Sequence, residues 1–442
     1  AHGVVYDTLE RQFGGAVSRT YAEAQQGALA WMADLVAIED IACDWRERSA
    51  YTYTNDAGHA DRLAREEQAS RRAGLPVAAS LSLPRPLEAV AGLQVTGQAE
   101  FHPCRYLARL ADLLEAAGGT IHERTRATDV QEGDPCVVST STGHEVRAAQ
   151  VVVATHFPFL DRAGFFARLR AERSYAIALP GPSGTLPAGM FYETGEQTRS
   201  LRVIPGDTHD LLVVGGAGHK AGQRRRDDAP FTDLEAWARE RFEHLGPVAH
   251  RWSAQDLISV DELPYVGRYW PASRRLWVAT GLRKWGYTNG TVAAMILSRR
   301  LLGRLHPWSK MFDTGRFHPI AAAPRFVREN ANVARRLLGD PVRTRLQAPS
   351  VEDLEPGTGR IVRHRGGKAA AYRDPEGVVH LCSTRCTHLG CEVRFNDSER
   401  SWDCPCHGSR FDPTDGEVLE GPAVHALHHE IDHDAPAPAA QD

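Results

Sequence analysis

Two short boxes, CTHLGC at residues 386–391 and CPCHGS at residues 404–409, carry the strongest chemical signal in this sequence. The first box contains a Cys-x-His pair and the second a Cys-x-x-His pair, and residues 392–403 separate them. Together they offer two thiolates and two imidazoles, with two cysteines left over. Zinc is the first alternative, because a set of two cysteines and two histidines suits it. Structural zinc loops favour Cys-x-x-Cys knuckles, however, and zinc would leave the extra cysteines without a role.

A [2Fe-2S] centre of the Rieske type uses the whole set. In such a centre two cysteines hold one iron and two histidines hold the other, and the neutral imidazoles raise the reduction potential because they add less negative charge than thiolates. The remaining pair, Cys391 and Cys406, lies in the same two loops and can form a disulfide if the two Cα atoms are within about 7 Å. The predicted metal ligands are Cys386 and Cys404 for the first iron, and His388 and His407 for the second.

The two boxes resemble those of the cytochrome bc-type Rieske proteins, in which the inner cysteine pair is disulfide-bonded. Residues 421–423, Gly-Pro-Ala, resemble the proline-containing loop that covers the cluster in that family. The resemblance spans about residues 350–427. It implies a disulfide between Cys391 and Cys406, and electron transfer as the role of this part of the chain.

One position departs from the pattern of that family. The family commonly has a tyrosine two residues after the serine of the second box, where its hydroxyl donates a hydrogen bond to a cysteine sulfur, whereas this chain has Phe411. Phenylalanine has no donor, and hydrogen bonds to sulfur stabilise the reduced, more negative cluster. We therefore predict a reduction potential in the lower part of the Rieske range of about −150 to +300 mV. Potentiometric titration of the cluster checks this expectation, and a value at the upper end would contradict it.

A second informative stretch, TGLRKWGYTNG at residues 280–290, lies between an apolar strand-like run (276–279) and an apolar helix-like run (292–302). Its three glycines allow close backbone approach, Thr288 or Asn289 can cap the helix, and the positive end of the helix points at whatever the loop holds. On these residues alone, a cofactor loop and an ordinary capped helix after a tight turn are equally well supported.

Residues 252–290 resemble the C-terminal flavin-binding segment of the FAD-dependent oxidoreductases of the glycine and D-amino-acid oxidase type. Residues 151–156 resemble the strand and turn that pack near FAD in this family, and the whole resemblance spans about residues 1–320. It implies that the helix after residue 290 faces the pyrimidine edge of the isoalloxazine, where reduced flavin gathers negative charge. The flavin contacts that it implies are Thr155, Gly281, Lys284, Trp285, Gly286, Thr288, Asn289 and Gly290.

The order of the two parts is also informative, because a subgroup of this flavoprotein family carries a C-terminal Rieske domain. The family begins with a βαβ unit whose G-x-G-x-x-G motif holds the FAD pyrophosphate, whereas this sequence starts at Ala1 without that unit. We therefore expect the chain to bind FAD weakly or not at all, since the pyrophosphate lacks its helix N-terminus. A G-x-G-x-x-A match at residues 216–221 is not the missing motif, because the polar run at 222–230 replaces the required helix.

Outside these motifs, apolar periodicity indicates alternating helices and strands. The first 72 residues are helix-rich, an amphipathic helix over 103–117 precedes a strand at 120–122, and short strands between residues 174 and 214 suggest one antiparallel sheet. The sequence thus predicts an α/β plus α+β flavoprotein fold, in which an incomplete Rossmann-like FAD domain with an antiparallel substrate sheet is followed by a small all-β Rieske domain. The predicted bounds are 1–320 for the oxidoreductase region without its first βαβ unit, 321–350 for a helical connector, 351–434 for the Rieske domain and 435–442 for a tail.

Composition argues against several other classes. A chain of 442 residues with 42% apolar and 24% charged residues is globular. Its net charge of −4, with acidic residues interleaved among the arginines, leaves no basic patch for nucleic acid. No apolar run reaches the roughly eighteen residues of a transmembrane segment. Five of the eight cysteines lie between residues 382 and 406, which indicates a metal site rather than a secreted disulfide scaffold. The sequence shows neither a membrane anchor nor a signal peptide, so we expect a cytoplasmic protein.

Two functional hypotheses follow. In the first, flavin exchanges two electrons with an organic small-molecule substrate, such as an amine or amino acid, and the Rieske centre exchanges single electrons with a redox partner protein or a small electron acceptor. In the second, the chain is a non-catalytic Rieske electron-transfer module on a flavoprotein scaffold that has lost FAD binding. A Rieske oxygenase is disfavoured because the inner cysteine pair is unlike oxygenase boxes. Arg202, Lys284 and Tyr287 are candidates for setting substrate polarity, and no catalytic base is identified.

Overall fold

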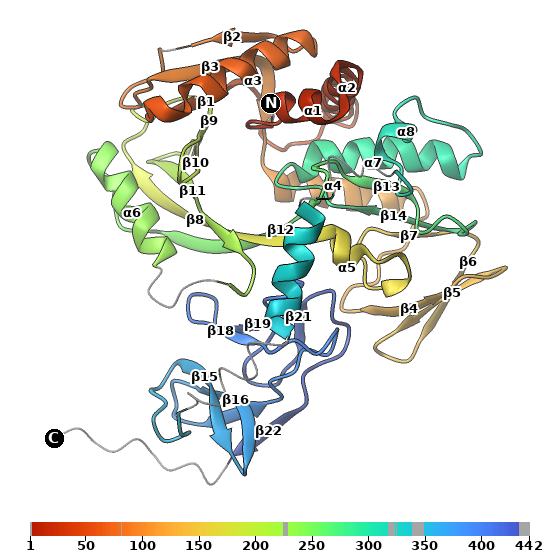
Figure 1. The fold of residues 1–442 in the computed structure, drawn as a ribbon. Helices are drawn as coiled ribbons and strands as arrows, with labels where there is room; N and C mark the ends of the chain where they lie inside the picture. The colour runs from red at the N-terminus through yellow and green to blue at the C-terminus, as the bar shows by residue number, and fades with distance from the viewer. Residues whose placement is uncertain are drawn as a thin grey trace.

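The computed structural model describes residues 2–80, 82–223, 229–316, 323, 325–337 and 349–432. Figure 1 shows a large mixed α/β unit, coloured red to green, and a small blue β-rich unit packed beneath it. A helical stretch at residues 325–337, cyan in Figure 1, runs beside the junction of the two units. The predicted tail (435–442) and part of the predicted connector (321–350) lie outside the described residues.

An eight-stranded sheet forms the middle of the large unit. Its strands are β1 (Arg46–Thr54), β2 (Val77–Ala79), β3 (Ala91–Glu100), β8 (Leu169–Gly181), β9 (Met190–Glu193), β10 (Arg199–Ile204), β11 (Asp210–Lys220) and β12 (His250–Ser259). Their order is β12-β8-β11-β10-β9-β1-β3-β2, and all neighbours are antiparallel except the parallel pair β1 and β9. The predicted antiparallel sheet is confirmed, and it is extended by β1, which lies within the segment predicted to be helix-rich.

Four helices and a second, three-stranded sheet form another part of the large unit. The helices are α1 (Tyr6–Phe13), α2 (Gly15–Ile38), α3 (Ala60–Arg72) and α7 (Gly286–Leu301), and the sheet contains β7 (Val151–Val153), β13 (Tyr265–Arg268) and β14 (Leu276–Thr280). Strand β14 pairs in parallel with β7 and antiparallel with β13. All five of its residues are buried, as expected for a strand covered on both faces. Helix α7 packs against α2 through an apolar core that includes Tyr21 and Val292.

Two local predictions differ from the structure. Residues 120–122, which follow α4 (Pro103–Ala116), are irregular rather than a strand. The next strands along the chain pair with one another and leave no partner for these residues. They form a separate antiparallel sheet of β4 (Ala127–Gln131), β5 (Cys136–Thr140) and β6 (Glu145–Ala148). The helix predicted over 292–302 begins earlier, at Gly286. The G-x-G-x-x-A match at 216–221 does not form a phosphate loop, because it runs along the end of β11: Gly216 pairs with both β10 and β8, and His219 and Lys220 pair with β8.

Five further helical elements of the large unit complete its described part. They are η1 (Ala57–His59), η2 (Asp161–Ala163), α5 (Phe165–Arg168), α6 (Pro230–Arg241) and α8 (Ser309–Phe312). Among the helices in the described part of the chain, none combines the length and apolar character needed to cross a membrane.

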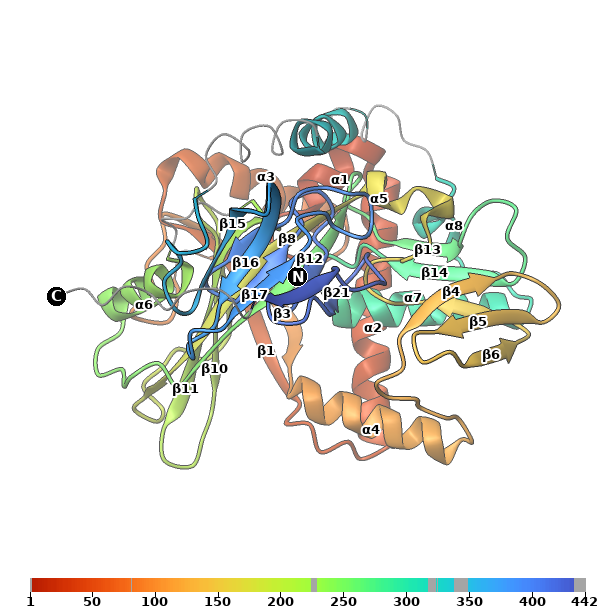
Figure 2. The same cartoon turned by 90° about the horizontal axis from the view of Figure 1, so that it is seen from below.

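The small unit consists of two four-stranded antiparallel sheets. One contains β15 (Thr358–His364), β16 (Gly367–Arg373), β17 (Val379–Cys382) and β22 (His429–Asp432), and the other β18 (Arg394–Asn396), β19 (Ser401–Asp403), β20 (Arg410–Phe411) and β21 (Val418–Glu420). Trp402 and Phe411 are fully buried in its core. The first cysteine box follows β17 and the second follows β19, so both boxes are loops of this unit. Figure 2 shows the unit lying in front of the central sheet.

Candidate iron–sulfur centre and flavin cavity

The two boxes adopt the same kind of tight turn. In the first box, the backbone N–H of Gly390 donates to the carbonyl of Cys386 at 2.9 Å, and in the second that of Gly408 donates to Cys404 at 3.0 Å. Gly390 and Gly408 have φ angles of +77° and +83°, a left-handed conformation that glycine adopts without a steric penalty. Each turn therefore begins with the cysteine that was predicted as an iron ligand.

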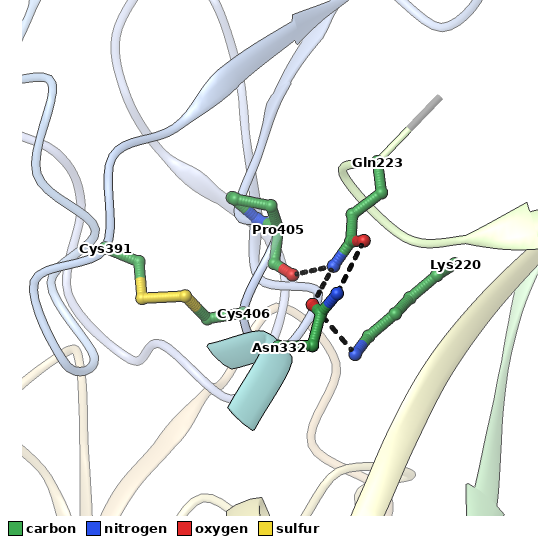
Figure 3. The surroundings of a disulfide bond; sticks show 6 residues. All are labelled: Lys220, Gln223, Asn332, Cys391, Pro405 and Cys406. Carbon is green, nitrogen blue, oxygen red and sulfur yellow. Dashed lines mark hydrogen bonds between the residues drawn. A yellow bond between two sulfur atoms is a disulfide. The ribbon is translucent and has the colours of Figure 1, made fainter. Parts of the chain in front are cut away.

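A disulfide joins the two turns. Cys391 and Cys406 are bonded, with their Cα atoms 6.4 Å apart (Figure 3). The Sγ atom of Cys404 lies within 4.8 Å of both disulfide sulfurs. Since a disulfide sulfur is not a thiolate, it is not available as a metal ligand. The free sulfurs in the two boxes are those of Cys386 and Cys404.

Cys386 and Cys404 form a buried pair. A hydrogen bond between the two thiols lowers the pKa of Cys386 to about 7; burial opposes this shift, and the backbone N–H of His388 and the Ser409 hydroxyl support it. The same bond and burial raise the pKa of Cys404 well above its usual value. Two buried thiols this close to each other could both bind one metal centre as thiolates.

The two histidines of the boxes lie next to each other. The ring centroids of His388 and His407 are 5.0 Å apart and their planes meet at 84°. Within the described residues, the Nδ1 atom of each ring is buried without a hydrogen-bond partner. Buried polar atoms are normally satisfied, so two adjacent buried nitrogens without a hydrogen-bond partner fit the role of metal ligands. Burial is the main cause that lowers the pKa of His407 to about 3, with smaller electrostatic contributions from the neighbouring His388 and Lys220, and it holds the His407 ring in the neutral form that binds metals.

The surroundings of the box residues bear on the predicted potential. Phe411 is fully buried and provides no hydrogen bond to sulfur. The Ser409 hydroxyl interacts with Cys386 and accepts a hydrogen bond of 3.1 Å from the backbone N–H of Ala423, in the loop that was predicted to cover the cluster. Cys382 is buried in the same core, and burial raises its pKa to about 12, as expected for an inert thiol. The low potential stays a prediction.

Two adjoining cavities open at the start of α7. One of about 200 Å³ is lined mainly by aromatic and apolar residues, and the other of about 310 Å³ by polar ones. Their combined size is within the range of about 300–1,000 Å³ typical of ligand sites. Both are lined by His2, Gly3, Tyr192, Lys284 and Trp285.

The first turn of α7 fits a flavin ring that gathers negative charge. Gly286, Tyr287 and Thr288 line the smaller cavity. The residue before the helix, Trp285, makes no side-chain capping hydrogen bond, so the N–H groups of the first turn keep their donor capacity. Asn289 does not cap the turn, because its side chain donates to the Leu282 carbonyl at 2.9 Å.

The structure brings together only part of the predicted flavin contacts. Lys284, Trp285, Gly286 and Thr288 line the cavities, whereas Thr155, Gly281, Asn289 and Gly290 are not among the lining residues. His2 was not identified from the sequence, although its ring stacks on Trp285 with centroids 4.7 Å apart and its Nε2 lies 3.0 Å from the Thr288 hydroxyl. A lone histidine in a helix-rich segment has no local signal for this role, since residue 288 is 286 positions away.

One strand separates the polar cavity from the cysteine boxes. Arg170 and Glu172 of β8 line the cavity, so Ala171, between them, points to the opposite face of the sheet. There it meets the second box: a Cβ atom built on Gly408 would lie 2.6 Å from the Cβ of Ala171. On the neighbouring strand β12, Gln255 donates a hydrogen bond of 2.9 Å to the Gly408 carbonyl.

Comparisons with known proteins agree with both parts of the site. The family model for FAD dependent oxidoreductases (DAO) matches residues 1–300, and that for the Rieske [2Fe-2S] domain matches residues 344–430. The Rieske 2Fe-2S iron-sulfur protein YhfW of Bacillus subtilis is 36% identical over 429 residues, which cover 96% of this chain and 83% of YhfW. The cytochrome b6-f complex iron-sulfur subunit 1 of Synechocystis sp. is 36% identical over 98 residues, 21% of this chain and 50% of that protein. The crystal structure of glycine oxidase from Geobacillus kaustophilus has a TM-score of 0.57 at 18% identity, covering 68% of this chain and 83% of that one, so the two share a fold.

Proposed function

Because this chain belongs to the FAD-dependent oxidoreductase (DAO) family and also carries a Rieske [2Fe-2S] domain, we propose that it couples the oxidation of an amine or amino acid to one-electron transfer through the cluster. FAD and the [2Fe-2S] cluster are its cofactors. FAD supplies a two-electron acceptor that can return its electrons singly, and the cluster supplies a one-electron carrier. Each substrate molecule oxidised therefore requires two one-electron transfers to a redox partner protein or a small acceptor.

The residues that would hold the cluster are the four free ligand groups of the boxes. The paired sulfurs of Cys386 and Cys404 and the orphaned Nδ1 atoms of His388 and His407 supply the two thiolates and two imidazoles that a Rieske centre needs. The disulfide between Cys391 and Cys406 keeps the two loops together. This donor set supports the ligand assignment.

The residues that would hold the flavin ring surround the first turn of α7. The backbone N–H groups of that turn, which have no side-chain cap, would stabilise negative charge on a bound ring, and Lys284 would add a positive charge at the wall that the two cavities share. His2 and Trp285, stacked on each other, form an aromatic wall of the same space. Their role is to orient the ring and exclude water.

The main observation that supports the proposal is that only one strand, β8, lies between the polar cavity and the second box at Ala171. The cavity and the second box touch opposite faces of β8, and stacked protein layers are only about 10 Å apart. Because electron tunnelling weakens steeply with distance, this arrangement favours transfer between a flavin in the cavity and a cluster held by the boxes.

An anaerobic reduction experiment tests the function. The purified chain, supplied with FAD, is mixed with a panel of small amino acids and amines that includes glycine and L-proline, the compounds that similar folds are named for. We expect at least one compound to bleach the flavin absorbance and then produce the EPR signal of a reduced Rieske cluster. Flavin that is bleached without any cluster signal would contradict the coupling. A chain with a full cluster and no bound flavin would instead support the non-catalytic electron-transfer module.

Arg202 is the proposed anchor for a substrate carboxylate. It lies in the wall of the smaller cavity with its side chain open to solvent, and its guanidinium is the group best suited to bind a carboxylate. Losing a hydrogen bond to a charged group costs about 1.5–3 kcal/mol, so we expect Arg202→Gln to raise the KM for an amino acid about 10- to 150-fold with little change in kcat. Steady-state kinetics measure both constants.

Two variants serve as controls for that prediction. Arg202→Lys keeps the charge and should recover part of the affinity. Arg48→Gln removes an arginine that is paired with Glu100 at 3.3 Å and is not among the residues that line the cavity, so its KM should match that of the wild type. An unchanged KM in Arg202→Gln would contradict the assignment.

We also propose the domain bounds and the location predicted from the sequence. The matched ranges, 1–300 and 344–430, support an oxidoreductase region over 1–320 and a Rieske domain over 351–434. Six of the eight cysteines are free thiols, which supports a reducing, cytoplasmic environment.

A further inference from the structure

The imidazole edge of the boxes is covered by the oxidoreductase region of the same chain. The Nε2 atom of His388 lies 2.9 Å from the Asp161 carboxylate, across the junction of the two units. Phe166 packs edge-on against both histidine rings, with centroid distances of 6.1 Å to His388 and 5.7 Å to His407. Only 4% of the His388 side chain is exposed. Asp161 and Phe166 both belong to the segment between β7 and β8.

Several further hydrogen bonds hold the boxes in this orientation. Gln223 Nε2 donates to the Pro405 carbonyl at 2.8 Å, beside the disulfide (Figure 3). Arg173, itself 1% exposed, pairs with Glu420 at 3.0 Å. The covered edge is thus the result of an interface with several contacts, and of the hydrogen bonds named here the one with Asp161 reaches a predicted iron ligand.

We propose that Asp161 is a positioning residue of the cluster, acting on iron through His388. This inference rests on the proposed cluster ligands. When Nδ1 of His388 is given to iron, its proton must be on Nε2, and the Asp161 carboxylate accepts the hydrogen bond that this proton offers. Such a bond selects the tautomer, fixes the ring orientation and makes the imidazole a more basic ligand.

The carboxylate also favours the oxidised, more positive state of the cluster. Both its negative charge and the added ligand basicity act in the direction of a lower reduction potential. Asp161 is half exposed, so water screens part of its charge, whereas the His388 side of the bond is buried. Arg162, the next residue, directs its guanidinium to Asp129 at 3.0 Å.

Potentiometric EPR of Asp161→Asn tests the inference. Asparagine keeps an acceptor of similar shape and removes the charge. We expect the midpoint potential of the cluster to rise, by up to a tenfold change in the one-electron equilibrium constant, or about 59 mV, with the iron and sulfide content unchanged. The matched control is Asp129→Asn, which removes an exposed carboxylate that bonds Arg162 rather than an iron ligand, and whose potential should equal that of the wild type.

Each outcome bears on the inference. A potential in Asp161→Asn no different from that of Asp129→Asn would overturn it. Loss of the cluster from Asp161→Asn, but from neither Asp129→Asn nor Asp161→Glu, would support it, because only the bond to His388 distinguishes these variants. The measurement uses no substrate and no flavin. A protein that holds its cluster yet oxidises no amino acid would therefore refute the proposed function without affecting this result.

Discussion

Cys404→Ser protein should contain no [2Fe-2S] cluster. Cys404 is 1% exposed and its sulfur is hydrogen-bonded to that of Cys386. These two are the free sulfurs among the described residues of the two boxes, so no third sulfur there can replace Cys404. A serine hydroxyl is a much harder and less acidic ligand than a thiol, and iron–sulfur clusters are held by thiolates. We expect iron and acid-labile sulfide to fall to background and the Rieske EPR signal to disappear.

Cys382→Ala is the matched control for this loss. Cys382 lies in the same apolar core and is also a free, buried thiol, but it is in β17, outside the boxes. Its replacement should lower stability by about 1 kcal/mol, as for small deletions in a core, and leave the cluster content unchanged. Cluster loss in Cys382→Ala with retention in Cys404→Ser would contradict the ligand assignment. Finding zinc in place of iron in the wild-type protein would contradict the assignment of these residues as ligands of an iron–sulfur cluster.

Gly408→Ala should release the Rieske domain from the oxidoreductase region. A Cβ atom at this position would lie 2.6 Å from the Cβ of Ala171 and 2.9 Å from the side-chain nitrogen of Gln255. The backbone of β8 cannot move away cheaply, because it is paired with β11 and β12 on both sides. Overpacking of this kind costs about 1–3 kcal/mol, which shifts the docked-to-released equilibrium about 5- to 150-fold toward release.

Gly390→Ala separates the clash from the backbone strain. Gly390 holds the equivalent place in the first box with a similar positive φ, but a Cβ atom there meets nothing within 4 Å in the described structure. Both variants carry the left-handed penalty of about 1–2 kcal/mol, and only Gly408→Ala also meets the other domain. Stopped-flow reduction by an amino acid should show slower cluster reduction in Gly408→Ala, with flavin reduction unchanged, and normal rates in Gly390→Ala. Equal rates in the two variants would contradict the route across β8.

The fold was predictable where its signal is local. The amphipathic helix α4 ends one residue from its predicted end, and the run of short apolar strands between residues 174 and 214 does form an antiparallel sheet. The prediction of a strand at 120–122 was wrong. A run of three residues with alternating polarity does not form a strand unless a neighbouring strand is available to pair with it. The strand β1 was missed because its partners in the sheet, β3 and β9, are distant from it in the sequence.

The candidate flavin site was only partly predictable for a similar reason. The loop at 280–290 was identified from its glycines and the helix that follows, and Lys284, Trp285, Gly286 and Thr288 do line the cavity. The opposite wall comes from β1, β9 and β10, where only Arg202 was a candidate from the sequence, and from His2, which is far from the loop in the chain. A cavity wall has no sequence signature when its members come from separate strands.

The chemistry of the cysteine boxes could be read from the sequence alone, because ligands within one box are at most a few residues apart and a tight turn leaves them little choice of arrangement. What surrounds those ligands was decided by tertiary structure. Asp161 and His388 are 227 residues apart, and Ala171 meets Gly408 only because a strand of one domain packs on a loop of the other. Such contacts depend on how the buried surfaces of two folded units match in shape and hydrogen bonding. The spacing of residues along the chain does not predict that match.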